Sequence, residues 1–273
     1  MNIPFFKYDG AGNDFILIDN RSGNISLMAE QIAHLCHRRM GVGADGLILL
    51  NATHDEYDFA MRYYNSDGLP ADMCGNGGRC IAAFAHQLGL GTATAQEQQG
   101  DVKPTLRFLA DDGTHEAWIV MWDSDERLGL VTLGMNDVSA SGITRCLDGW
   151  LLNTGVPHYV QRVENLVDFD VVGEGRRIRH LPELGPAGAN VNFIEDFPDG
   201  RLMVRTYERG VEDETWACGT GVTACAIVSG NRRLCTKGGD FRVDFESTGT
   251  AFTHVRLTGP VSLNFTGEMV INA

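Results

Sequence analysis

Two cysteines each precede a glycine-rich turn and an apolar segment that is predicted to be helical. The first lies in ADMCGNGGRC, residues 71–80, and the second lies in WACGTGVTAC, residues 216–225. A cysteine at the start of a helix lies beside unpaired backbone N–H groups and the positive end of the helix dipole, which lower its pKa. The same N–H groups can bind a carboxylate, and glycine lets a ligand approach the backbone closely. Cys74 and Cys218 are therefore candidate catalytic thiols.

The two cysteine loops belong to a longer internal repeat. Residues 61–85 and 203–228 each begin with a strand that contains Arg and Tyr and continue through an acidic loop with a glycine. Each then reaches Cys-Gly-x-Gly and an apolar helix, and the two cysteines are separated by about half of the chain. A repeat at half-length predicts two similar domains, each with one cysteine at a helix N-terminus.

A pair of thiols on one substrate could invert a carbon centre that carries a carboxylate. One thiolate would remove the α-proton from one face, and the other thiol would supply a proton to the opposite face. Helix N-termini would stabilise the charge that develops on the carboxylate in the carbanion-like transition state. This chemistry requires neither a metal ion nor a pyridoxal cofactor.

Two other interpretations of the cysteines remain open. A single cysteine before a helix is most often a small buried hydrophobic residue, although two copies in matched contexts favour a functional pair. A redox protein could use Cys74 and Cys218 as a dithiol switch. The redox interpretation predicts a functional disulfide rather than turnover, whereas the two-base reaction needs both sulfurs reduced.

The composition is that of an acidic protein of ordinary hydrophobicity. The chain has 273 residues and a formal net charge of −14, which argues against nucleic acid and anionic membranes as partners. No apolar run approaches the ~20 residues of a membrane span, and the N-terminus lacks the pattern of a secretory signal. Seven irregularly spaced cysteines favour a reducing compartment, so we expect a cytoplasmic protein.

The pattern of residues predicts a mixed α and β chain. Ser26 is a plausible N-cap for the first helix. The expected elements are two strands around a glycine-rich loop at 5–20, a helix at 26–40, strands at 47–50 and 57–65, a buried helix at 79–90, a hairpin with an Asp-Gly turn at 106–122, a polar loop at 89–104 and a turn at 124–127.

The other glycine-rich stretch, GVGADG at residues 41–46, is predicted to be a plain turn. It matches G-x-G-x-x-G, but a helix precedes it and a strand follows it, which is the reverse of a dinucleotide-binding loop. No phosphate-binding G-x-x-x-x-G-K-[ST] motif occurs. Zinc is not expected, because the chain has no Cys-x-x-Cys or His-x-x-x-His pair.

Taken together, the motifs along nearly the whole chain resemble those of the diaminopimelate epimerase family, a cofactor-independent family of lysine and peptidoglycan precursor synthesis. The motifs that carry the resemblance are GAGNDF (10–15), GVGADG (41–46), NSDG (65–68), MCGNGGRC (73–80), GVPH (155–158), GANVNF (188–193), YERG (207–210) and ACGTG (217–221).

The resemblance implies an α/β fold of the α+β type. It implies two pseudo-symmetric domains, each a curled, mostly antiparallel sheet or barrel around a central helix, with the site in the cleft between them. We expect residues 1–122 plus 260–273 to form the domain that carries Cys74, and residues 123–259 to form the domain that carries Cys218. The family also implies a homodimer and a small amino-acid substrate.

The resemblance assigns roles to particular residues. The catalytic pair of the family falls on Cys74 and Cys218, and its pKa-tuning residues fall on His158 and Glu208. When the L,L substrate reacts, the Cys218 position deprotonates and the Cys74 position protonates, and the roles swap in reverse. The family's substrate contacts fall on Asn13, Asn65, Gly75, Asn76, Asn190, Glu208, Arg209, Gly219 and Thr220.

The chemistry of these contacts suits a substrate with two amino-acid ends. The residues that directly follow each cysteine offer backbone N–H groups to the reacting carboxylate, and Arg209 can bind the distal carboxylate with two hydrogen bonds. The asparagine amides can bind the distal amine and carboxylate.

Two positions depart from the family pattern. Many members have Gln where this chain has Gly46, and many have Gly-Asn-Pro-His where this chain has Gly-Val-Pro-His, so that Val156 replaces an asparagine. Both missing side chains contact the distal end of the substrate in the family. The alternative is therefore another two-thiol racemase or epimerase on the same fold with a different amino-acid substrate.

Overall fold

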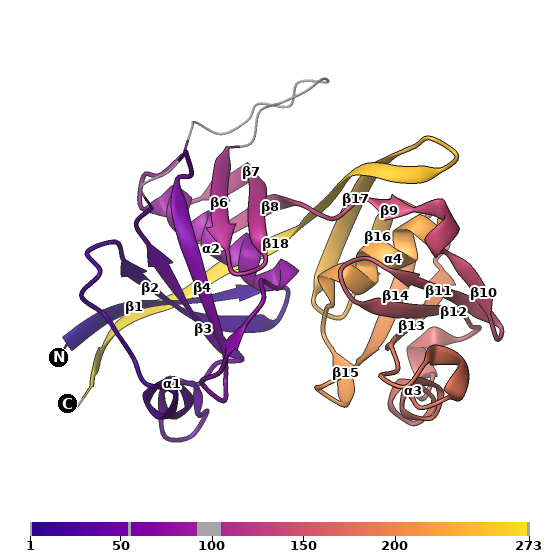
Figure 1. Cartoon of the computed structure of the whole chain (residues 1–273), viewed down its shortest axis with the longest axis horizontal. Helices are drawn as coiled ribbons and strands as arrows, with labels where there is room; N and C mark the ends of the chain where they lie inside the picture. Colours follow the sequence, from indigo (N-terminus) through magenta and orange to yellow (C-terminus); the bar gives the residue numbers. More distant parts are fainter. Residues whose placement is uncertain (1, 54–55, 92–104, 272–273) are drawn as a thin grey trace. The chain divides into compact units, whose positions relative to one another are not determined.

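The computed structural model describes residues 2–53, 56–91 and 105–271, and the chain forms two compact units (Figure 1). Unit 1 takes in the chain up to Leu133 together with the segment from Pro260 onward, and unit 2 comprises Gly134–Gly259. The predicted boundary after Trp122 lies near the end of β7 (Gly113–Asp123). Because β7 pairs with β8 (Leu128–Gly134), a boundary at that position would separate the two strands of a hairpin.

Unit 1 is a curled sheet around the helix α2 (Gly75–Gln87). The helix packs against β1, β2, β3, β4 and β7, and its residues from Gly75 to Ala85 are buried. The remaining elements of this unit are β1 (Asn2–Gly10), β2 (Asn13–Asn20), α1 (Ala29–Cys36), β3 (Gly46–Asn51), β4 (Phe59–Asn65), β5 (Pro70–Ala71) and β6 (Leu106–Ala110).

Unit 2 has the same plan around the helix α4 (Gly219–Ser229). This helix packs against six strands, from β11 to β14 and also β16 and β17. The elements of unit 2 are β9 (Val138–Ser139), β10 (Thr144–Cys146), β11 (Gly149–Asn153), β12 (Pro157–Arg162), α3 (Val171–Arg179), β13 (Asn190–Asp196), β14 (Leu202–Glu208), β15 (Asp213–Thr215), β16 (Arg233–Thr236), β17 (Gly239–Ser247) and three short 3-10 helices (Ala140–Gly142, Leu166–Asp168, Pro182–Leu184). The long strand β18 (Ala251–Val270) supplies residues to both units.

The two units repeat the same strand pairings in the same order. In unit 1 the β1–β2 pair is antiparallel, β2–β3 parallel, β3–β4 antiparallel and β4–β6 parallel. In unit 2 the corresponding pairs β11–β12, β12–β13, β13–β14 and β14–β16 have the same senses. The pairings therefore confirm that the sequence repeat is a structural repeat.

Strand alternation separates two faces of each sheet. One face of the unit 1 sheet packs on α1 through a cluster that includes Ile16, Ile18 and Leu47. One face of the unit 2 sheet packs on α3 through a cluster that includes Val191, Phe193 and Tyr207. The side chains that alternate with these along each strand point to the opposite face of the sheet, which packs on the central helix.

Most of the predicted elements are confirmed. The strand–loop–strand at residues 5–20, the strands at 47–50 and 57–65, the buried helix, the 106–122 hairpin and the turns at 41–46 and 124–127 are all present. Most of the predicted polar loop at 89–104 lies outside the described residues. No helix in the described ranges is long and apolar enough to cross a membrane.

The predicted cap of the first helix is wrong. The helix begins at Ala29, so Met28 and not Ser26 precedes it. The Gln31 side chain accepts a hydrogen bond from the Met28 N–H at 2.9 Å. A residue inside the first turn therefore caps this helix, and the serine lies outside it.

Candidate active site

Cys74 is the N-cap residue of α2. Its backbone is extended, with φ −99° and ψ 146°, and its sulfur accepts a hydrogen bond from the Gly77 N–H at 3.2 Å. Gly75 and Asn76 form the first turn of the helix, and both are buried. The thiol thus lies at a helix N-terminus, where backbone N–H groups and the helix dipole favour a thiolate.

A chain of amides connects the first turn of α2 to the start of β2. The buried Arg79 donates to the Asn76 Oδ1 at 2.9 Å and to the Gly75 carbonyl at 3.2 Å. Asn76 in turn donates to the Asn13 Oδ1 at 3.3 Å, and Asn13 donates to Asp45 at 2.6 Å. The structure therefore brings together Asn13, Gly75 and Asn76, three of the predicted substrate contacts, beside Cys74.

Asn65 lies at the end of β4, on the same edge of the unit 1 sheet. The register pairs Phe15 with Gly46 and Gly46 with Asn65, so the start of β2, the start of β3 and the end of β4 are adjacent. Asn65 is exposed, and its backbone closes the turn to Gly68 and Leu69. Its side chain is therefore available to a ligand at this edge.

Cys218 occupies the matching position in unit 2 as the N-cap residue of α4. Its side chain is 7% exposed, and its backbone is extended, with φ −117° and ψ 110°. The Thr220 Oγ1 lies 3.5 Å from the Cys218 sulfur, within hydrogen-bond distance for sulfur. Gly219 and Thr220 form the first turn of the helix, as Gly75 and Asn76 do in unit 1.

His158, on β12, contacts the Thr220 side chain. Its Nε2 is 2.9 Å from the Thr220 Oγ1, and its Nδ1 is 3.1 Å from the Asn192 Nδ2. The ring is fully buried, and this burial lowers the pKa of His158 to about 3. The contact with Asn192 opposes the shift, and the charge of Arg209 adds a smaller lowering of the pKa. His158 is therefore neutral at physiological pH, and it contacts Cys218 through the Thr220 hydroxyl.

Glu208, Arg209 and Asn190 lie together where β14 ends beside the start of β13. The Asn190 Oδ1 accepts from the Arg209 N–H at 2.8 Å, and the Glu208 Oε2 accepts from the Thr215 hydroxyl at 2.9 Å. The Arg209 guanidinium donates to the Gly188 carbonyl at 3.5 Å. Glu208 and Arg209 are both partly exposed, so both can meet a ligand.

The two departures from the family pattern have different structural settings. A Cβ atom built on Gly46 would lie 2.5 Å from the Tyr64 carbonyl oxygen and 2.5 Å from the Tyr63 ring, so a side chain here requires the backbone to shift. Val156 is half-buried in the loop before β12, and its carbonyl accepts from the Thr154 N–H at 3.3 Å. No hydrogen bond from its side chain is possible.

Sequence reasoning missed three residues that support the site. Asn192 contacts His158, Thr206 donates to Asn192, and Arg79 donates to Asn76. The signal for Asn192 was present in the sequence, because Asn190 and Asn192 alternate along a strand and so share one face. Thr206 has the same relation to Glu208 on β14. Only the pairing of the two strands places Thr206 opposite Asn192.

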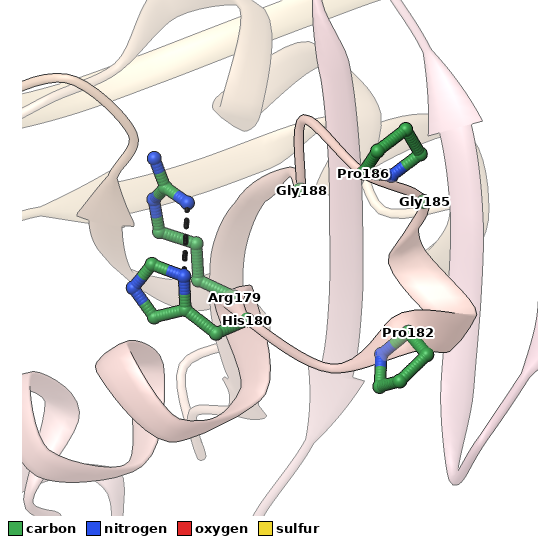
Figure 2. Close-up of a pocket in the computed structure, with 6 residues that line it drawn as sticks. All are labelled: Arg179, His180, Pro182, Gly185, Pro186 and Gly188. Atoms are coloured by element: carbon green, nitrogen blue, oxygen red, sulfur yellow. Dashed lines mark hydrogen bonds between the residues drawn. The ribbon is translucent and has the colours of Figure 1, made fainter.

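A separate cavity of about 350 Å³ is lined by the end of α3 and by the loop that leads from α3 to β13 (Figure 2). It is lined by Arg179, His180, Pro182, Gly185, Pro186 and Gly188. It contains none of the predicted site residues, and its link to them is the Gly188 carbonyl that Arg209 contacts. Among the described residues, no group of three or more His, Cys, Asp or Glu side chains could hold a metal ion.

Named relatives match this chain in sequence over nearly its whole length. The family model described as diaminopimelate epimerase matches residues 5–121 and 150–261. The chain is 42% identical to the diaminopimelate epimerase of Flavobacterium psychrophilum, with 96% of this chain and 98% of the relative covered. It is 35% identical to that of Aquifex aeolicus, with 98% of each covered.

Solved structures with low sequence identity share the fold. A probable proline racemase from Agrobacterium radiobacter is 15% identical, with a TM-score of 0.68, and the match covers 99% of this chain and 93% of that one. A hydroxyproline epimerase from Agrobacterium vitis is also 15% identical, with a TM-score of 0.63. The predicted fold class, two repeated units with sheets around central helices, is confirmed.

Proposed function

The chain belongs to the diaminopimelate epimerase family, and from this premise we propose that it converts L,L-2,6-diaminopimelate to the meso form without a cofactor. The observation that carries the proposal is the pair of cysteines at the N-termini of two buried helices that occupy equivalent places in a duplicated fold. The reaction would serve lysine and peptidoglycan precursor synthesis, as the family resemblance implies.

In the proposed reaction the two sulfurs transfer one proton each. The Cys218 thiolate takes the α-proton of the L,L substrate, and the Cys74 thiol gives a proton to the opposite face of the same carbon. The products are the inverted centre, a Cys218 thiol and a Cys74 thiolate, so the reverse reaction starts from the swapped pair. The proposal requires both sulfurs to reach one α-carbon.

Other residues would hold the substrate and its developing charge. The backbone N–H groups of Gly75, Asn76, Gly219 and Thr220 would bind the reacting carboxylate and stabilise the carbanion-like transition state. Arg209, Asn13, Asn65, Asn190 and Glu208 would bind the distal amino-acid end. His158 and Glu208 would tune the proton affinity of the thiols.

The decisive experiment is NMR of L,L-diaminopimelate with the purified, reduced protein in D2O. We expect deuterium at the α-carbon together with meso product. Cys218→Ala and Cys74→Ala should each lower the rate by at least about 100-fold, because each removes one acid–base partner. Cys36→Ala, in the core cluster on α1, should retain activity.

Failure of the experiment would also be informative. No exchange by folded, reduced protein would contradict diaminopimelate as substrate and would point to the alternative, a two-thiol racemase for another amino acid. Gly46 and Val156 would then be the first positions to explain the change. Full activity of Cys74→Ala and Cys218→Ala would contradict the two-base reaction itself.

We further propose a cytoplasmic homodimer. The seven free cysteines suit a reducing compartment. The β7–β8 hairpin exposes apolar side chains, among them Met121 and Leu130, which are paired across the two strands. Exposed apolar side chains of this kind are typical of subunit contacts. Light scattering of the purified protein tests the dimer, and a monomer at micromolar concentration would contradict it.

A further inference from the structure

Asn192 is fully buried on β13 and uses its whole amide group. Its Nδ2 lies 2.9 Å from the Tyr159 carbonyl oxygen and 3.1 Å from the His158 Nδ1. Its Oδ1 accepts from the Thr206 hydroxyl at 2.9 Å. Because a carbonyl oxygen can only accept, the NH2 group must face Tyr159, and its second hydrogen then points at the His158 ring.

This orientation determines which nitrogen of His158 carries the proton. The buried ring is neutral, so it has a single N–H. Since Nδ1 accepts from Asn192, the hydrogen is on Nε2, where the nearest partner is the Thr220 Oγ1 at 2.9 Å. The Asn190 Nδ2 lies 3.5 Å from the same nitrogen, at the limit of a hydrogen bond.

The hydrogen of the Thr220 hydroxyl is then directed to the sulfur. Thr220 accepts from Nε2, so its own hydrogen is free for the Cys218 Sγ, 3.5 Å away. We propose that Asn192, supported by Thr206, is a positioning residue that orients the Thr220 hydroxyl toward the Cys218 thiolate through the tautomer of His158. This inference rests on the proposed function, because it concerns how one of the two thiols is prepared for proton transfer.

Unit 1 shows that the fold does not require these polar side chains. The pairs His158–Asn190 and Asn192–Thr206 in unit 2 correspond to Phe15–Gly46 and Ile48–Tyr63 in unit 1. In unit 1 these positions hold Phe, Gly, Ile and Tyr, and the centroids of the Phe15 and Tyr63 rings are 5.9 Å apart in an edge-on arrangement. Burying a polar group costs free energy unless it is hydrogen-bonded. The polar residues at the equivalent positions of unit 2 are therefore explained by a role other than packing.

The hydrogen-bond donors described for the two sulfurs are of different kinds. The Cys74 sulfur accepts from the Gly77 backbone N–H, whose direction the helix sets. The donor to Cys218 is a hydroxyl that can rotate, so its direction has to be imposed by a neighbour. Two other titratable groups interact electrostatically with this pair, Arg209 with His158 and Cys225 on α4 with Cys218, and Glu208 precedes Arg209 at the end of β14. They remain unchanged in the variants below.

The first test measures the tautomer and needs no activity. Protein labelled with 15N-histidine should show the His158 signal as an Nε2–H tautomer at pH 7, and the spectrum of His158→Gln identifies that signal. Asn192→Asp replaces the donor by a carboxylate that accepts, so the hydrogen should move to Nδ1. An Nδ1–H tautomer in the wild type, or an unchanged tautomer in Asn192→Asp, would overturn the inference.

The second test measures kcat/KM against pH in both directions. Loss of the Thr220 hydrogen bond should raise the proton affinity of Cys218, so the acidic limb for the L,L substrate and the basic limb for the meso substrate should both move to higher pH. We expect a loss of about 10- to 100-fold at neutral pH, the effect of one hydrogen bond to a charged group. An equal loss at every pH, with no movement of either limb, would indicate a purely structural role and contradict the inference.

Asn192→Ile provides a second variant in case the aspartate prevents folding. Unit 1 has an isoleucine, Ile48, at the position that corresponds to Asn192. It removes the donor to Nδ1, so both tautomers of His158 should appear and the pH limbs should move in the same direction. If the wild type shows the Nε2–H tautomer but no exchange on diaminopimelate, the proposed function fails while the role of Asn192 stands.

Discussion

At the scale of single residues, the surroundings of Cys74 and Cys218 differ from those of three core cysteines. Burial raises the pKa of the Cys80 and Cys225 thiols well above the ordinary value, and it raises the pKa of Cys36 to about 11. These thiols lie in the cores of their units and are protonated at neutral pH. Cys74 and Cys218 differ from them because they lie at helix N-termini, where a hydrogen-bond donor is within reach of each sulfur.

His158 should make the protein sensitive to acid. Its pKa is about 3 in the folded protein and about 6.5 when unfolded, so the unfolded chain binds more protons between these values. Stability therefore falls as the pH drops below the unfolded value. Between pH 7 and pH 5 the wild type should lose about 2 kcal/mol more than His158→Gln.

Urea unfolding at the two pH values measures this difference. Other titrating groups are present in both proteins, so they cancel in the comparison. An identical loss in wild type and variant would show that His158 is not buried and neutral.

At the scale of elements, close contact between α4 and the sheet of unit 2 requires glycine at position 221. A Cβ atom there would lie 2.5 Å from the Asn192 Oδ1 and 3.3 Å from the His158 Cε1. Unit 1 repeats the feature, because a Cβ atom on Gly77 would lie 3.2 Å from the Ile48 Cδ1. The first turn of each central helix is thus held against the strands that carry the site.

Gly221→Ala should therefore displace the start of α4. We expect a loss of about 1–3 kcal/mol in stability from overpacking. We also expect a fall in kcat of up to about 100-fold, because Cys218 moves with the helix. Thermal unfolding and steady-state kinetics measure the two effects.

Gly142→Ala is the matched control. It has nothing within 4 Å of its Cβ position, so its effect on stability should stay within about 0.5 kcal/mol. Normal stability and normal kcat in Gly221→Ala would contradict the close contact.

At the scale of the whole molecule, the proposed reaction joins two units that each carry half of the chemistry. Treatment with the thiol oxidant diamide should link Cys74 to Cys218 through a disulfide, with the two hydrogens transferred to diamide. Activity should then fall by at least about 100-fold, because neither sulfur can accept or donate a proton. Dithiothreitol should restore it.

Peptide mass spectrometry identifies the linked cysteines in that experiment. Cys36→Ala should behave like the wild type, since its thiol is buried in the α1 core. Activity that persists in protein with a mapped Cys74–Cys218 disulfide would exclude the two-base reaction. Activity that appears only in the oxidised protein would favour the redox alternative.

The cysteine pair and the duplication could be predicted from the amino-acid sequence. Both follow from local patterns, namely Cys-Gly-x-Gly before an apolar helix and the repetition of that context at half-length. The central helices and most strands were also predictable, because hydrophobic spacing is a local property. The cap of α1 differs from the prediction, because the helix begins at Ala29 and the N–H of its N-cap residue, Met28, donates to Gln31. The roles of His158, Glu208 and the asparagines came from the family resemblance alone.

Only the tertiary structure decided how these residues meet. Asn192 and Thr206 lie on different strands, and Thr220 lies on a helix that packs over both, so no spacing along the chain predicts their contact. The equivalence of Phe15 with His158 likewise appears only when the strand registers of the two units are compared. Strand register and helix packing depend on contacts between residues far apart in sequence, and local patterns carry no information about them.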